Sequence, residues 1–259
     1  MTIEPKLFTK NYVNDECGFV FSSNSALGPY LYDRDNDSQW VSDGENSDST
    51  ESSVAITFKE GGVEVLRDID TVILINHNFE DPVIESWNGS SWDALDSETD
   101  LTDGTITVFS FTETETSRIR ISTSATIDAD AEKAIGEVIA CDSLITFTRD
   151  LASYTPNFNS RKAYELQLAD GSIHRSKVMN SLNRSAKYEA RIRFDLLSES
   201  EIETLQGIFE SGNTLTWQPE SVTRPTEIYQ VFWSGTFSPV YSTSYKGAGF
   251  RIDVTFKET

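Results

Sequence analysis

The stretch Thr71-Val72-Ile73-Leu74-Ile75-Asn76 indicates the fold class, because an unbroken apolar run of this length is typical of a strand covered on both faces. In other segments apolar and polar residues alternate instead. In residues 54–58 the apolar side chains of every second position share one face. In residues 117–122 the isoleucines face inward, and Arg118 and Arg120 face outward. Strands of both kinds predict a mostly β protein.

Similar short apolar segments recur through residues 1–150, and long polar loops such as 33–53 separate them. The segment from Trp87 to Trp92 contains Asn88-Gly89, a strong short-range signal for a hairpin turn. Seven or eight short strands with such loops are typical of a sandwich. We therefore expect residues 1–150 to form an N-terminal β-sandwich or jelly roll.

Residues 151–259 show a different pattern. The strands that alternate most clearly are 188–196 and 250–256. Between them we expect a helix near 199–211, with Ser198 as N-cap and Glu201 completing a capping box. This second unit is therefore predicted to be a β-sheet domain with one packed helix.

The net charge of −21 belongs entirely to the first unit. Residues 1–150 contain 30 Asp/Glu and 9 Lys/Arg, whereas residues 151–259 contain 12 of each. A chain this acidic does not neutralise phosphates, so we expect neither nucleic-acid binding nor attachment to anionic membranes. We expect the acidic unit to stand in solvent and the neutral unit to pack against partners.

The sequence contains few residues suited to catalysis. Cys17 and Cys141 are expected to be buried free thiols, although their distance apart in the fold is open. Two histidines, His77 and His174, are too few and too far apart in sequence to suggest zinc ligation or a nucleophile with its base. No phosphate-binding or nucleophile-elbow glycine pattern occurs. We expect a protein that is not an enzyme, with a glycosidase-type carboxylate pair as a further hypothesis.

Four residues of the first unit are candidates for ligand binding: Trp40, Trp87, Trp92 and His77. Aromatic faces beside polar loops form platforms for sugars, but tryptophans equally fill sandwich cores. His77 follows a buried strand, where its imidazole either contacts a ligand or ties a loop by hydrogen bonds. Both alternatives stay open for each residue.

Asp33, Asp35 and Asp37 place carboxylates at alternate positions, as in a calcium-binding loop. Ser38 occupies the position that such a loop gives to glycine, and the closing glutamate is missing. A solvated acidic loop is the preferred interpretation, and a structural calcium ion is the alternative. We expect no other cofactor.

Three stretches of the first unit carry a family resemblance: Leu31-Tyr32-Asp33 leading to Gln39-Trp40, then 70–78, then 133–138. In this order they resemble the galactose-binding-like, discoidin-type jelly-roll modules of bacteriophage and prophage tail proteins. In the second unit the strand 188–196, the helix with Glu201 and Leu205, and the strand 249–258 resemble the β-sheet-plus-helix domain of distal and minor tail proteins.

The resemblance implies a structural virion protein of a phage tail tip, in which identical subunits form a ring that links the tail tube to the hub or fibres. The partners would be other copies of the chain and the tail tube and hub proteins. The alternative is a carbohydrate-binding module for host cell-surface glycan. We expect synthesis in the bacterial cytoplasm, because residues 1–10 do not read as a signal peptide and no apolar run is long enough to span a membrane.

Overall fold

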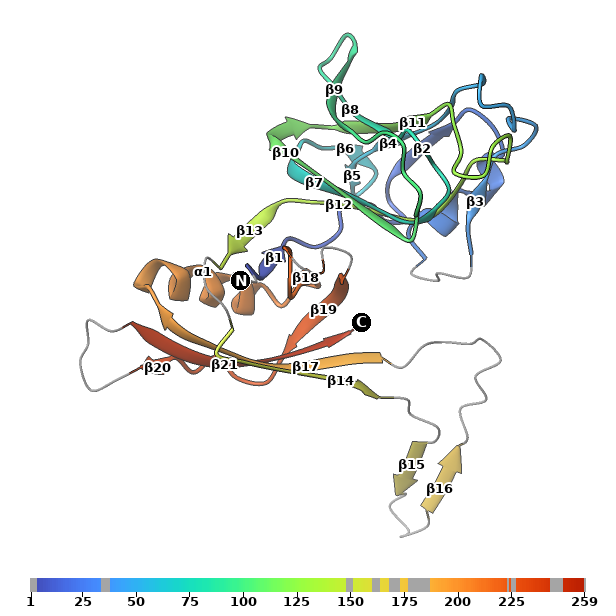
Figure 1. Cartoon of the computed structure of the whole chain (residues 1–259). Coiled ribbons are helices and arrows are strands. Elements are labelled where there is room, and N and C mark those ends of the chain that lie inside the picture. The colour runs from blue at the N-terminus through green and yellow to red at the C-terminus, as the bar shows by residue number, and fades with distance from the viewer. Residues whose placement is uncertain are drawn as a thin grey trace.

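The computed structural model describes residues 4–33, 38–147, 151–159, 164–167, 173–176, 187–222, 224, 227–242 and 249–258. The fold is mostly β, as predicted, and the strand pairings in the described residues are antiparallel. Figure 1 shows a sandwich and, next to it, a curved sheet that holds a helix. Each of the two bodies has a buried apolar cluster of its own.

The sandwich consists of two facing sheets. The first has the strand order β10-β7-β12-β3 and contains β3 (Trp40–Val41), β7 (Arg67–His77), β10 (Ile106–Thr116) and β12 (Ala134–Cys141). The second has the order β2-β4-β11-β8-β9 and contains β2 (Gly18–Phe21), β4 (Ser52–Thr57), β8 (Val83–Trp87), β9 (Trp92–Ser97) and β11 (Arg118–Thr123). Smaller elements are the pair β5 (Lys59–Glu60) and β6 (Val63–Glu64) and the 3-10 helix η1 (Ser25–Leu31).

Strand β7 lies between β10 and β12 and contains the apolar run that indicated the fold class. Val72 and Leu74 are buried in the sandwich core, whereas Ile73 is buried in a separate cluster on the opposite side of the sheet. The prediction of a strand covered on both faces is therefore confirmed. The cover on its second side comes from the other body.

The second body is one curved sheet with the order β13-β1-β18-β19-β21-β17-β14, and β20 adds to β21. Its strands are β1 (Lys6–Phe8), β13 (Ser143–Thr146), β14 (Ser153–Asn159), β17 (Lys187–Leu197), β18 (Leu215–Gln218), β19 (Tyr229–Ser234), β20 (Val240–Tyr241) and β21 (Phe250–Glu258). A further hairpin pairs β15 (Tyr164–Gln167) with β16 (Ile173–Ser176). Residues 168–172, which connect these two strands, lie outside the described residues.

Helix α1 (Glu199–Ser211) confirms the prediction for residues 199–211. The Ser198 Oγ accepts a hydrogen bond from the Glu201 backbone N–H at 3.2 Å, and the Glu201 carboxylate accepts one from the Ser198 N–H at 2.6 Å. Gly212 ends the helix in the left-handed conformation, with φ of 61°. The buried stripe of Ile202, Leu205 and Ile208 packs into the core of the curved sheet.

The start of the chain belongs to the second body rather than to the sandwich. Strand β1 pairs with both β13 and β18, and Leu7 lies opposite Trp217 in that core. The sandwich is thus inserted between β1 and β13, whereas the expected division placed residues 1–150 in one unit. Local pattern could not assign β1 to the second body, because its three residues obtain their burial from strands more than 130 positions away.

A small apolar cluster joins the two bodies, formed by Phe8 of β1 with Ile73, Ile139 and Cys141 of the sandwich. The two connecting segments also bond to each other, since the Thr9 N–H donates to the Asp142 carbonyl at 2.9 Å. Both cysteines are buried free thiols, as predicted. None of the helices in the part of the chain that the structure describes is long and apolar enough to cross a membrane.

Candidate functional site

The hairpin of β8 and β9 presents two of the three candidate tryptophans. Its turn is built by Asn88, whose side-chain oxygen accepts hydrogen bonds from the Ser90 and Ser91 N–H groups, each at 2.9 Å. Trp87 and Trp92 are direct cross-strand partners at the end of this turn. The Asn-Gly signal therefore fixes the register that brings the two rings together.

The two indoles meet edge to face, with ring centroids 5.3 Å apart and an angle of 61° between the ring planes. Along β8 the side chains of Ile84 and Ser86 are buried, and those of Val83, Glu85 and Trp87 are partly exposed. Trp87 therefore lies on the solvent side of the sandwich, and Trp92 is half-exposed beside it. Such a pair stabilises the hairpin and also presents aromatic surface to solvent.

Arg120 of β11 flanks this pair and faces outward, as predicted. Its guanidinium carbon lies 5.1 Å from the centre of the Trp92 ring, within the range of a cation–π contact. Glu85, its partner across the strands, accepts a hydrogen bond from Arg120 Nη2 at 2.7 Å. This bond raises the pKa of Arg120 and holds the guanidinium in place. We name Trp87, Trp92, Arg120 and Glu85 the tryptophan platform.

Trp40 is not part of this surface. It is fully buried, its ring stacks on Phe21 at 5.6 Å, and its indole N–H donates to the Ser23 carbonyl at 3.3 Å. Its use as a ligand platform is therefore wrong, and the alternative of a core residue holds. Trp40 is buried because it lies in β3, which pairs with β12 in the first sheet of the sandwich.

His77 is also buried, being 5% exposed, and its two ring nitrogens have partners inside the protein. Nδ1 accepts from the Phe79 N–H at 3.2 Å, so Nε2 carries the proton and donates to Thr107 Oγ1 at 2.8 Å. Burial lowers the pKa of His77 to about 4, so the ring is neutral near neutral pH. The residue ties the strand end to its loop and does not face a ligand, which corrects its place among the binding candidates.

This burial predicts a loss of stability in mild acid. An unfolded His77 takes up a proton near pH 6.5, whereas the folded one takes it up only near pH 4. The contribution of His77 is therefore complete above pH 6.5 and is lost as the pH falls toward about 4, by up to about 3 kcal/mol in the free energy of unfolding. Urea titrations across this range should show the fall.

The control for this measurement is His77→Gln, which retains a polar side chain but has no titration in this window. Asp142 acts in the opposite direction, because burial raises its pKa to about 6 and the folded state then gains stability as the pH falls through that value. The difference in the free energy of unfolding between wild type and His77→Gln, followed across the pH range, gives the contribution of His77 alone. Parallel pH profiles for the two proteins would contradict the assignment.

Only one of the three proposed calcium ligands lies among the described residues. Asp33 is exposed and accepts a hydrogen bond from Ser38 Oγ at 2.6 Å, while Asp35 and Asp37 lie outside the described residues. Within the part of the chain that the structure describes, no group of three or more His, Cys, Asp or Glu side chains is placed to hold a metal ion. The calcium ion stays a prediction.

A residue that sequence reasoning did not single out fastens the neighbouring acidic loop. Lys133 is fully buried, and its ammonium group donates to the backbone carbonyls of Glu45 and Ser47, each at 2.8 Å. Its own N–H donates to Ser42 Oγ at 2.9 Å. A buried lysine of this kind needs such acceptors, and it supplies positive charge where the loop 42–51 has an excess of carboxylates.

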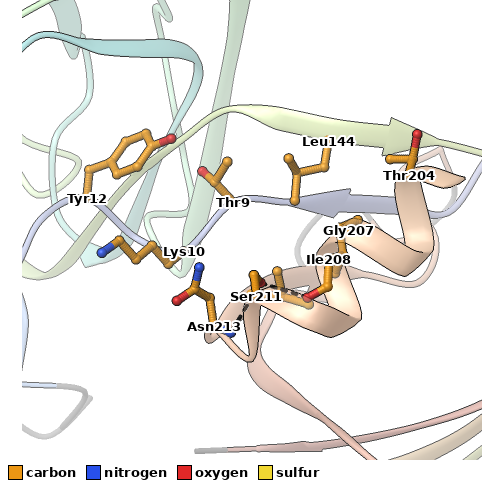
Figure 2. A pocket seen from close by; sticks show the side chains of 10 residues that line it. Thr9, Lys10, Tyr12, Leu144, Thr204, Gly207, Ile208, Ser211 and Asn213 are labelled. Atoms are coloured by element: carbon orange, nitrogen blue, oxygen red, sulfur yellow. Dashed lines mark hydrogen bonds between the residues drawn. The ribbon is translucent and has the colours of Figure 1, made fainter. Parts of the chain in front are cut away.

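A groove of about 380 Å³ lies at the junction of the two bodies (Figure 2). Its lining residues are Thr9, Lys10, Tyr12, Leu144, Thr204, Gly207, Ile208, Ser211, Asn213 and Leu215. Ser211 Oγ donates to the Ile208 carbonyl at 2.7 Å, so this hydroxyl serves the end of α1. The groove shares no residue with the tryptophan platform, and none of the candidate residues lines it.

The sequence matches no family model and no curated protein. Solved structures similar to about half of the chain include a family 32 carbohydrate-binding module from Clostridium perfringens NanJ in complex with galactose, which is 13% identical. The match covers 53% of this chain and 99% of that chain, with a TM-score of 0.42.

A Clostridium perfringens module, CpGH89CBM32-5 in complex with GalNAc-β-1,3-galactose, is 10% identical, with coverages of 48% and 94% and a TM-score of 0.41. Chitosan-binding module 2 in complex with chitotriose, from a chitosanase/glucanase of Paenibacillus sp. IK-5, is 18% identical, with coverages of 48% and 95% and a TM-score of 0.40. Identities this low do not relate individual residues of these proteins to residues of this chain.

Proposed function

We propose that the chain is a carbohydrate-binding protein and that the tryptophan platform is its binding surface. The observation on which this proposal rests is the pair of half-exposed indoles at the hairpin end, held in one geometry by the cross-strand register. Sugar rings have apolar C–H faces that pack on aromatic rings, and their hydroxyls need polar partners at the edge. Glu85 and Arg120 supply such partners beside the rings.

The polar groups at the platform are suited to binding rather than to turnover. Glu85 is engaged by Arg120, and Asp93 Oδ2 accepts a hydrogen bond from Asn88 Nδ2 at 2.8 Å. Both carboxylates are thus committed to hydrogen bonds within the protein, which position the arginine and the turn. We therefore propose a protein without glycosidase activity, and product formation from any polysaccharide in a screen would contradict this.

Replacing either indole should remove binding. On a glycan array, wild-type protein should retain one or more glycans, and Trp87→Ala and Trp92→Ala should each weaken that binding at least about tenfold, because each removes an aromatic face. The matched control is Tyr241→Ala, which removes an aromatic side chain that is 46% exposed in the second body. An array without retained glycan, or binding unchanged in both tryptophan variants, would refute the proposal.

A structural subunit of a phage tail tip is the second candidate. The observation that favours it is the exposure of three apolar side chains where β17, β20 and β21 meet, those of Leu196, Val240 and Tyr241. Leu196 is in the left-handed conformation, with φ of 60°, at an irregularity in the pairing of β17 with β21. A leucine held outward in an unfavourable conformation is consistent with a contact surface.

The edge of the curved sheet argues against assembly by simple strand addition at β14. Among the described residues β14 pairs only with β17, and Pro156 lies at its centre. A proline has no N–H to donate to an added strand, so it protects such an edge. The exposed apolar side chains near β20 are therefore the more suitable contact for a ring. Light scattering tests this second candidate, since a protein that stays monomeric and ignores tail tube and hub proteins would contradict it.

A further inference from the structure

The hairpin that bears the tryptophan platform belongs to a strongly acidic part of the chain. Residues 80–103 contain eight Asp/Glu and no Lys or Arg. Asp93 follows Trp92 directly and is exposed, whereas Glu98 lies beyond the other end of β9. Because residues 1–150 contain 30 Asp/Glu and 9 Lys/Arg, a ligand at the platform approaches an anionic body, which attracts cations and repels anions.

The one cation within the platform does not reverse this field. Arg120 lies over the Trp92 ring, but its guanidinium is hydrogen-bonded to the carboxylate of Glu85, so the pair is neutral together. The contact also shows that the Trp92 ring accepts a positive charge on its face. Within the described residues, no cation–π contact is formed with the ring of Trp87.

We propose that the platform selects glycans with free amino groups, such as oligomers of glucosamine. This inference rests on the carbohydrate binding proposed above and names the class of sugar. The ammonium group of such a sugar gains from the negative face of an indole and from the surrounding carboxylates, while its ring packs on the aromatic surface. A neutral N-acetylated sugar gains only the packing, and uronic or sialic acids are repelled.

The test compares two ligands that differ only in this charge. Binding of glucosamine oligomers and of N-acetylglucosamine oligomers of equal length is measured by calorimetry on the full chain, at a pH where the free amines are protonated. The glucosamine oligomer should bind about tenfold more tightly at low salt. Its advantage should shrink several-fold at about 0.5 M salt, because screening removes the long-range attraction.

A pair of charge variants locates the effect. Asp93→Asn removes one carboxylate next to Trp92 and keeps an oxygen that can accept from Asn88, so it should lower the preference about threefold. Glu203→Gln removes an exposed carboxylate of α1 in the other body and should leave the preference unchanged. Thermal unfolding of both variants near the wild-type temperature shows that they are folded.

The outcomes separate the two proposals. Equal affinity for the two oligomers, or a preference for acidic glycans, would overturn the selection for amino sugars and leave carbohydrate binding intact. Binding to neither oligomer, together with an array that retains no glycan, would overturn the proposed function and this inference with it. An unchanged preference in Asp93→Asn would also count against the inference.

Discussion

Lys133→Met should cost about 2–4 kcal/mol in the free energy of unfolding of the sandwich, because two carbonyls lose a hydrogen-bond donor. The wild-type ammonium group is fully buried and satisfies the Glu45 and Ser47 carbonyls at 2.8 Å. Methionine occupies a similar volume without a donor, so the Glu45 and Ser47 carbonyls lose this partner and the acidic loop 42–51 loses its cation. A loss of this size is expected only for a buried lysine, because a surface lysine contributes far less to the free energy of unfolding.

Urea unfolding followed by circular dichroism measures the change. The matched control is Lys10→Met, the same substitution at an exposed lysine, for which we expect a change within about 0.5 kcal/mol. If Lys133→Met and Lys10→Met unfold at the same urea concentration, the ammonium group does not fasten the loop as inferred.

Trp40→Ala should be about as damaging, with a loss of about 3–5 kcal/mol, while leaving the tryptophan platform itself untouched. The side chain is fully buried in the sandwich core and stacks on Phe21, so its removal leaves a cavity. The broken hydrogen bond to the Ser23 carbonyl adds to the cost of the cavity.

The control is Trp92→Ala, in which the side chain removed is half-exposed and the cost should be only about 1 kcal/mol. Stability and glycan binding should therefore separate, since Trp40→Ala lowers stability and Trp92→Ala lowers binding. Similar stabilities for the two variants would mean that Trp40 does not fill the core. Because each body has its own core, unfolding is followed by probes of both.

The pairing of Trp87 with Trp92 in the tryptophan platform could be predicted from the sequence, but the contact of Arg120 with the Trp92 ring could not. Asn88-Gly89 between two tryptophans is local information, and a turn of this kind sets which residues face each other. Arg120 lies 28 positions after Trp92, so its position over the ring depends on the pairing of β11 with β8. Alternation alone showed that Arg120 faces outward, but not which aromatic ring it covers.

For Trp40 and His77 the sequence did not decide between a binding site and the core. Both lie beside polar loop residues in the sequence, a setting that suits a binding site as well as a core. Their burial depends on which strands cover them, and for Trp40 this is the pairing of β3 with the distant β12. The lysine at position 133 has no local signal at all, since its acceptors are backbone carbonyls that any residue could provide.

The sequence by itself determined the strand-rich class, the central strand β7, the capped helix α1 and the hairpin of the tryptophan platform, because each depends on periodicity or turn chemistry within a few residues. Only the tertiary structure decided that β1 and β13 belong to the second body, which tryptophan is exposed and which cation holds the acidic loop. The physical reason is that burial is a property of contacts between segments far apart in the chain, whereas propensity acts between neighbours.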